Sequence, residues 1–254
     1  MKPRPDISIL LLTWNRAPYL ERCLREMFAS FSPDVSREVI LMDNGSTDGT
    51  AAILAGYENR PGVRLVRNPA NEGLEAYKKL FSMARGRLMI EVDDDVLAFP
   101  IGFDRTFLEY FKAYPDYGYL GLNVLQNEKT TGAKAPVDRY REDRRGDLVV
   151  EEGPVGGWCS AFHRRHYQLV KPLLRFFRFS MARSEDGTIM GFIQKVFRKR
   201  IGLIRDAVCF HATGAVYSRE AGLLDRDIEK YRIGGLSDMA LQYSRAKDEL
   251  SASL

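Results

Sequence analysis

Residues 7–46 read ISILLLTWNRAPYLERCLREMFASFSPDVSREVILMDNGS, and this stretch decides the fold. Two continuous apolar runs, 7–12 and 38–42, are typical of strands covered on both faces of a parallel sheet. Between them an apolar stripe recurs at helical spacing, formed by Leu20, Cys23, Leu24, Met27 and Phe28. The stretch therefore predicts a β-α-β unit.

The same alternation continues towards the carboxyl terminus, with a helix over 47–55, a strand at 63–66, a helix over 72–84 and a strand at 87–92. Strands separated by helical patterns predict a parallel sheet with right-handed crossovers. We expect an α/β fold, with a mostly parallel central sheet, helices on both faces and a smaller subregion in the second half of the chain.

The regular alternation stops near Pro100. Beyond it the patterns predict a helix over 103–113, a strand at 117–124, a polar surface loop or lid over 127–147, a basic helical region over 163–200, a strand at 203–210 and an amphipathic segment around 223–233. The loop prediction rests on the high charge of that stretch.

Composition excludes several classes of protein. The 254 residues are 45% hydrophobic, which is enough for a full core and excludes wholesale disorder. A formal net charge of +4 is too small to argue for nucleic acid. Three cysteines without metal or disulfide spacing suggest a reducing, cytosolic compartment. The first apolar run, 7–12, is too short for a membrane span or a secretory signal.

Polar clusters follow three of the predicted strands: Thr13–Arg16, Asp43–Ser46 and Asp93–Asp95. Because the carboxyl ends of parallel strands share one edge of a sheet, we expect these clusters to converge on a ligand. Each cluster alone has a plainer explanation, as a turn or as the cap of the next helix. Their coincidence favours a binding site.

Three consecutive aspartates at a strand end, Asp93, Asp94 and Asp95, repel one another and lose hydration, so they need a cation. Carboxylates with at most one imidazole favour Mg²⁺ or Mn²⁺ over zinc. The alternative is a solvated acidic turn.

Several motifs occur together in a recognisable order: 8–16 (SILLLTWNR), 41–50 (LMDNGSTDGT), 68–95, which ends in three aspartates, then 184–186 (SED) and His211. On these motifs the chain resembles glycosyltransferase family 2, inverting enzymes of the GT-A fold that use nucleotide-sugars. The resemblance covers about residues 6–215. It implies a DXD motif ending at Asp95.

The resemblance also implies roles for individual residues. Asp95 and His211 would bind Mn²⁺ or Mg²⁺, although a lone strand-end histidine is more often structural. The nucleotide-sugar would contact Thr13, Asn15, Arg16, Asp43, Gly45, Ser46, Asn71, Gly73, Asp93 and Asp94. A UDP-sugar is the expected donor. Trp14, Asn44, Lys78 and Leu80 depart from the family pattern, which leaves the sugar open.

The acceptor hydroxyl needs a base, and Asp186 suits this role because the dipole of a following helix stabilises a carboxylate at its start. Glu185 would assist it or hold the acceptor. The plainer alternative is that both residues cap the helix. Gly157 and Trp158 would contact the acceptor, the alternative for Trp158 being a core position.

The resemblance divides the chain into a nucleotide-sugar half (1–100), an acceptor half (101–215) and a helical tail (216–254), within one compact domain. Residues 164–205 hold eleven basic and two acidic residues, a local net charge of +9. With their aromatic side chains they suit either an anionic membrane surface or a solvated basic face. No nucleic-acid partner is expected.

We therefore expect a metal-dependent inverting glycosyltransferase that moves a sugar from a UDP-sugar to a glycan, a glycolipid or another hydroxyl acceptor, as in polysaccharide biosynthesis. We expect it in the cytoplasm, peripheral at the inner face of the membrane. One alternative is a nucleotidyltransferase that forms nucleotide-sugars, but the segment 13–19 (TWNRAPY) lacks the required glycine run. Another is a non-catalytic module that binds sugar nucleotides.

Overall fold

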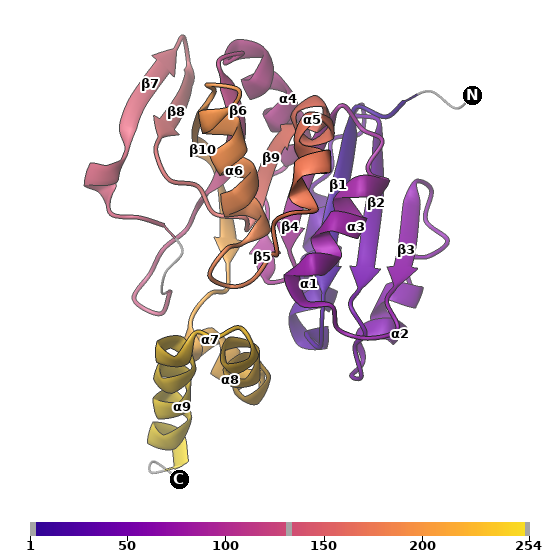
Figure 1. The fold of residues 1–254 in the computed structure, drawn as a ribbon, viewed down its shortest axis with the longest axis vertical. Helices are drawn as coiled ribbons and strands as arrows, with labels where there is room; N and C mark the ends of the chain where they lie inside the picture. Colours follow the sequence, from indigo (N-terminus) through magenta and orange to yellow (C-terminus); the bar gives the residue numbers. More distant parts are fainter. Residues whose placement is uncertain (1–3, 131–133, 252–254) are drawn as a thin grey trace.

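A computed structural model describes residues 4–130 and 134–251. Ten strands form one sheet in the order β3-β2-β1-β4-β9-β6-β10-β8-β7, and β5 pairs with β10 (Figure 1). The strands are β1 (Ile7–Thr13), β2 (Arg37–Asp43), β3 (Val63–Arg67), β4 (Leu88–Asp93), β5 (Val96–Ala98), β6 (Tyr117–Val124), β7 (Arg141–Arg145), β8 (Leu148–Glu152), β9 (Cys159–His163) and β10 (Arg200–His211).

Helices pack around this sheet, and α3, α5 and α6 lie together in front of it in Figure 1. The helices are α1 (Ala17–Ala29), α2 (Thr50–Ala55), α3 (Ala76–Met83), α4 (Phe103–Ala113), α5 (Arg164–Leu174), α6 (Glu185–Lys195), α7 (Ala215–Glu220), α8 (Leu224–Ile233) and α9 (Ser237–Ser251), with short 3₁₀ turns η1 (Gly73–Glu75) and η2 (Val137–Arg139). The expected α/β class is confirmed.

Strand β1 lies at the centre of the parallel part of the sheet, between β2 and β4. Its continuous apolar run is buried on both faces, as the sequence predicts. The chain moves outward from β1 to β2 and β3, and then returns through α3 to β4 on the other side of β1. This reversal creates a topological switch point between β1 and β4, the place where open α/β sheets bind ligands.

Beyond β4 the sheet is mixed. Strand β9 runs antiparallel to both β4 and β6, whereas β10 runs parallel to β6. The antiparallel entry of β9 brings the turn before it to the switch point, where the Asp93 amide donates to the Trp158 carbonyl oxygen at 2.9 Å. A segment far along the chain therefore reaches the end of β4.

The expected loop over 127–147 is partly wrong, because residues 141–145 form the edge strand β7, paired with β8. Side-chain ion pairs balance the high charge of this strand, so the polar composition did not indicate a loop. Arg145 pairs with Asp116, and Arg141 pairs with Glu152. Residues 131–133 of the expected loop lie outside the described residues. The basic region over 163–200 is two helices, α5 and α6, separated by ten residues.

Helices α7, α8 and α9 gather beyond the end of β10 in Figure 1, where the chain leaves the sheet. Leu224, Ile228 and Tyr243 form a small apolar core of their own between these helices. Within the described residues, no helix combines the length and apolar character that a membrane crossing requires.

Candidate active site

A cavity of about 870 Å³ opens at the switch point between β1 and β4. Its walls come from segments that are far apart in the sequence, including the end of β1, the turn before α3, the triple aspartate, the start of α6, the end of β10, and helices α8 and α9. All three polar clusters that the sequence places at strand ends contribute to it: Thr13, Asn44 and Asp93 are among its lining residues.

The guanidinium of Arg16 forms ion pairs with three aspartates, two of which line the cavity. Its Nη1 lies 2.9 Å from Asp94 Oδ1 and 2.5 Å from Asp95 Oδ2, and its Nη2 lies 3.3 Å from Asp227 Oδ1 in α8. The second oxygen of Asp94 accepts a hydrogen bond from the Thr13 hydroxyl at 2.7 Å. Both oxygens of Asp94 are thus held by Arg16 and Thr13, whereas Asp95 gives only Oδ2 to Arg16 and turns Oδ1 towards His211.

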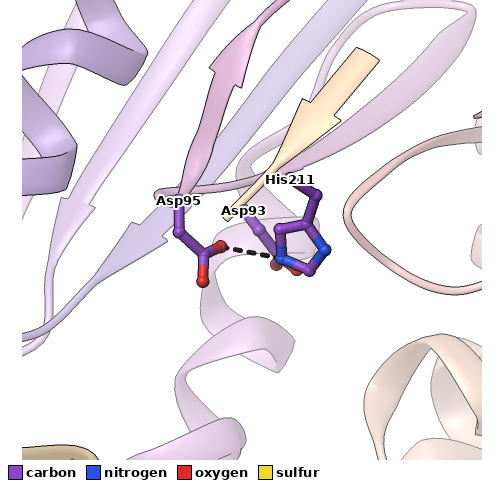
Figure 2. A group of neighbouring side chains, drawn as sticks. All are labelled: Asp93, Asp95 and His211. Carbon is purple, nitrogen blue, oxygen red and sulfur yellow. Dashed lines mark hydrogen bonds and ion pairs between the residues drawn. The ribbon is translucent and has the colours of Figure 1, made fainter. Parts of the chain in front are cut away.

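Asp93, Asp95 and His211 form a cluster whose ligand atoms all lie within 4.8 Å of one another. Figure 2 shows the His211 imidazole turned towards both carboxylates. Its Nε2 lies 3.0 Å from Asp95 Oδ1 and 3.7 Å from Asp93 Oδ2. The fold places His211 here because β10 pairs with β5, which follows the aspartates directly, with Val96 opposite His211.

This donor set fits a divalent cation such as Mn²⁺ or Mg²⁺, since two carboxylates and one imidazole converge from different strands. Burial opposes charge on Asp95, but Arg16 and His211 outweigh it and hold the Asp95 pKa below its usual value. Burial and the neighbouring Asp95 raise the pKa of Asp93 to about 6. Burial lowers the His211 pKa, yet the charge of Asp95 raises it overall, so a bound cation would displace the imidazole proton.

Asn44 joins the turn before α3 to the end of β2. Its Nδ2 donates to Asn71 Oδ1 at 2.9 Å and to the Gly73 carbonyl at 3.1 Å, and its Oδ1 accepts from Asn68 and from the Glu72 amide. The expected nucleotide residues Asn71 and Gly73 line the cavity, as does Asn44 itself. Asn44 belongs to the polar cluster Asp43–Ser46 that the sequence predicts at the site, but no local pattern indicates its hydrogen bonds to the turn before α3.

Four of the expected nucleotide residues, Asn15, Asp43, Gly45 and Ser46, are not in the cavity lining. They build the turn behind it. Asp43 Oδ1 accepts from the Ser46 amide, and the Asn15 amide donates to the Ser46 hydroxyl, both at 2.9 Å. Gly45 has φ +76°, and a side chain there would meet the Ala70 backbone at 2.5 Å. The turn therefore requires glycine.

Asp186 lies at the start of α6, in the cavity wall. Ser184 caps the helix by accepting from the Gly187 amide, and Asp186 Oδ1 accepts from the same amide at 2.6 Å. Helix capping, the plainer prediction from the sequence, is therefore present. Asp186 is nevertheless partly exposed, and its Oδ2 points towards Gly157, where an added Cβ would lie 3.2 Å away. Gly157 thus keeps the space beside this carboxylate open.

Glu185 differs from its neighbour because it is buried against a second acidic side chain, Glu91 of β4. Neither oxygen of Glu91 has a hydrogen-bond partner within the described part of the chain, and the same holds for Glu185 Oε2. Burial, and then the charge of Asp186, raises the pKa of Glu185 to about 8. Burial and Glu185 also raise the pKa of Glu91. Glu185, whose pKa is raised by burial, therefore lies beside the more exposed Asp186.

The replacement Glu185→Gln should flatten the dependence of stability on pH. The folded-state pKa of about 8 lies above the ordinary value of 4.5 for a glutamate. Between these two pH values the folded state holds more protons than the unfolded state, so the free energy of unfolding falls as pH rises through this window. Glutamine cannot lose a proton there. We expect the variant to exceed the parent in stability at pH 8 by about 1 kcal/mol or more.

Urea unfolding at pH 5 and pH 8 measures this difference, with the exposed Glu21→Gln as the matched control. Equal pH dependence in the parent and in Glu185→Gln would show that Glu185 titrates normally.

Trp158 is buried, and its Nε1 donates to the Leu122 carbonyl at 2.9 Å. The structure therefore places it at the core position that was the alternative for it, and Trp158 is not among the residues that line the cavity. A side chain on Gly156 would collide with the indole ring, which explains the glycine before it. The indole ring lies next to the His211 imidazole, with ring centroids 6.1 Å apart, and so helps to hold this member of the carboxylate and histidine cluster in place.

Helix α8 contributes cationic groups that the sequence did not place at the site. Arg226 and Lys230 line the cavity together with Tyr231. Arg226 Nη1 lies 2.6 Å from Asp227 Oδ1, and its Nη2 donates to the Trp14 carbonyl at 2.7 Å. Burial and the charge of Arg16 lower the pKa of Lys230. The amphipathic pattern around 223–233 predicts a helix, but nothing in it shows which part of the fold the helix meets.

The site is a carboxylate and histidine cluster at the switch point of a mixed α/β sheet, which is where this class of sheet binds its ligands. The family model described as "Glycosyl transferase family 2" matches residues 8–200. The chain therefore belongs to this family, as the sequence motifs predicted. The match ends before His211 and before α8.

Individual relatives agree with this assignment. The chain is 28% identical over 109 residues to the chondroitin synthase of Pasteurella multocida, a match covering 42% of this chain and 11% of that protein. The chain spans less than half the length of the curated relatives it matches.

Two solved structures show the same fold. The mannosyltransferase PcManGT from Pyrobaculum calidifontis, in complex with GDP-Man and Mn²⁺, is similar with a TM-score of 0.62 and 17% identity, over 100% of this chain and 77% of that one. S. aureus TarS 1-349 in complex with UDP-GlcNAc is similar with a TM-score of 0.62 and 13% identity, over 95% of this chain and 72% of that one. These likenesses confirm the expected GT-A fold.

Proposed function

We propose that the protein is a metal-dependent inverting glycosyltransferase, which moves a hexose-type sugar from a nucleotide-sugar to a hydroxyl group of a glycan or lipid-linked acceptor. The observation that carries the proposal is the cavity itself. It brings the cluster of Asp93, Asp95 and His211 and the carboxylate of Asp186 into the lining of one cavity of about 870 Å³. Membership of the family supports the same reaction.

Asp186 acts as the base in this proposal. It accepts the proton of the acceptor hydroxyl while that oxygen attacks the anomeric carbon, and the bond from this carbon to the diphosphate breaks. Attack from the side opposite the leaving group inverts the configuration. Gly157 gives the acceptor access to the carboxylate. Asp95 and His211, with Asp93, would hold Mn²⁺ or Mg²⁺, whose chemistry there is to neutralise the charge that develops on the leaving diphosphate.

The remaining cavity residues hold the donor. Asn71 and Gly73 present an amide and a backbone turn on the nucleoside side, and the turn of Asn15, Asp43, Gly45 and Ser46 fixes their position from behind. Thr13, Arg16 and Asp94 form the floor, with their charges balanced internally. Lys230 and Arg226 add positive charge near the acidic cluster, which suits a diphosphate.

The deciding experiment incubates the protein with a panel of nucleotide-sugars and Mn²⁺, and measures which nucleotide is released, with and without a chelator. Release that depends on the metal supports the proposal, and proton NMR of the product then reports whether the anomeric configuration is inverted. Formation of a nucleotide-sugar from a nucleoside triphosphate and a sugar phosphate would instead assign a nucleotidyltransferase. Binding without turnover for every donor and acceptor would indicate a non-catalytic module.

For the nucleotide, we expect UDP to raise the melting temperature more than GDP or ADP does, because the turn of Asn71 and Gly73 resembles the uracil side of the family's pocket. A ligand at a hundred times its dissociation constant adds about 2.7 kcal/mol to stability. Differential scanning fluorimetry with Mn²⁺ and each nucleotide measures this shift. A larger shift with GDP would transfer the donor assignment to GDP-sugars, the type bound in the PcManGT structure.

A further inference from the structure

Helix α5 and the turn after it carry a stripe of exposed apolar side chains that belong to no hydrophobic cluster of the described residues. Leu169, Leu173 and Phe176 are spaced by four and three residues, so they follow one side of the helix and of the turn after it. Leu169 is 67% exposed and Phe176 is 71% exposed. The opposite side of α5 holds the buried Tyr167 and Val170 and already makes the contact with the sheet. The three side chains of the stripe are therefore not part of the hydrophobic core.

The charged side chains within this segment of the chain are all positive. From Arg164 to Ser184 the chain has six Lys or Arg residues and no Asp or Glu. Within the described part of the chain none of these six forms an ion pair, whereas Arg141, Arg145 and Arg200 on the β7–β8 side are all paired with carboxylates. Within the basic region 164–205, residues 164–184 are therefore the part in which no Lys or Arg side chain is paired with a carboxylate.

Charge and apolar surface are joined in one patch, here named the α5 ridge. Its members are Arg165, Leu169, Lys171, Leu173, Arg175 and Phe176, all of them exposed. The Arg175 guanidinium lies over the Phe176 ring, 4.6 Å from its centroid. An amphipathic helix with basic residues beside exposed aliphatic and aromatic side chains has the composition of a helix that lies in a membrane interface.

We propose that the α5 ridge docks the protein on an anionic phospholipid membrane. Leu169, Leu173 and Phe176 enter the boundary between headgroups and acyl chains, and the flanking cations contact the lipid phosphates. A nucleic acid would use the charge but would leave three large apolar side chains in water. The inference stands on the ridge alone and does not require the proposed reaction.

Docking has a consequence for the cavity that does rest on the proposed function. The segment after Phe176 turns directly into the cavity wall, where Arg178, Phe179 and Ser180 are lining residues. A docked ridge holds this wall beside the lipid headgroups. An acceptor whose sugar is attached to a membrane lipid through a phosphate would then present its hydroxyl on the side where Asp186 lies.

Vesicle co-sedimentation tests the docking with the full chain. The vesicles are phosphatidylcholine alone, or phosphatidylcholine mixed with phosphatidylglycerol. We expect binding to the anionic vesicles only, weakening as salt is added. At about 1 kcal/mol for each cation near the surface, the charge variant Lys171→Gln/Arg175→Gln should bind roughly 30-fold more weakly. The apolar variant Leu169→Ser/Phe176→Ser should lose roughly tenfold or more.

The matched control is Ile101→Ser/Arg25→Gln, which removes an exposed aliphatic group and a cation elsewhere on the surface and should bind like the parent. Circular dichroism confirms that each variant is folded. Absence of vesicle binding, or equal binding by all variants, overturns the proposal. So does a parent that self-associates without lipid and becomes monomeric in the ridge variants, because the ridge would then be a protein interface. Failure of nucleotide release in the donor panel, with vesicle binding intact, contradicts only the proposed function.

Discussion

The replacement Asp186→Asn is expected to slow sugar transfer by roughly 10²–10⁴-fold, the usual contribution of a positioned base. Asparagine keeps the size of the side chain and can still accept from the Gly187 amide, so α6 should begin as before. It cannot take the proton of the acceptor hydroxyl. Because Asp186 is not one of the three residues that could hold the metal ion, binding of the donor should change little.

Steady-state rates with a saturating donor, together with the melting shift caused by UDP and Mn²⁺, separate these two effects. Glu185→Gln is the matched control, since it makes the same change at the adjacent position, where the carboxyl is buried against Glu91. Inactive Glu185→Gln with active Asp186→Asn would transfer the role of base to Glu185. Near-normal rates in both variants would place the base elsewhere.

Loss of the Asp95 carboxylate should remove both Mn²⁺-dependent nucleotide binding and transfer. Metal stabilisation of transition-state charge is worth several kcal/mol, so the rate should fall by roughly 10³-fold. Asp95→Asn is the better variant than Asp95→Ala, because the amide oxygen of asparagine can still accept a hydrogen bond from Arg16, whereas alanine cannot. His211→Ala should have the same effect less completely, since Asp93 and Asp95 remain.

Calorimetric titration of Mn²⁺ into each variant in the presence of UDP measures the site directly. The matched control is Asp94→Asn, the same change one residue earlier, at a carboxylate whose two oxygens are held by Arg16 and Thr13. This variant should keep its Mn²⁺ binding. Full activity of the parent in excess chelator, or normal Mn²⁺ binding by Asp95→Asn, would contradict the metal assignment.

The parts of the site that lie at strand ends were predictable from the sequence. Buried parallel strands are continuous apolar runs, and the polar residues that follow them must meet at one edge of the sheet. This reasoning located Thr13 and Asp93, and the structure brings both into the cavity lining. The resemblance to the family added His211, which no local pattern distinguishes from a structural histidine.

The rest depends on tertiary contacts that have no local signal. Asp186 and Glu185 are adjacent and chemically alike, and only the position of Glu91 under α6 makes one of them buried and the other open. Charge alone made β7 resemble a loop, because its ion-pair partners, such as Asp116, lie far away in the sequence. Helix α8 was predictable as a helix, but its contact with Arg16 was not.

That last contact has a consequence for the order in which the site is made. Arg16 and Asp227 are 211 positions apart, so during synthesis Arg16 leaves the ribosome long before its α8 partner exists. The strands β1 to β4 can pair early, whereas the charge balance at their ends is completed only when the last helices arrive. A chain truncated at residue 200, where the family match ends, would keep the aspartates but lose His211, Arg226 and Asp227. The part of the chain that the family model matches is therefore shorter than the part that completes the cavity.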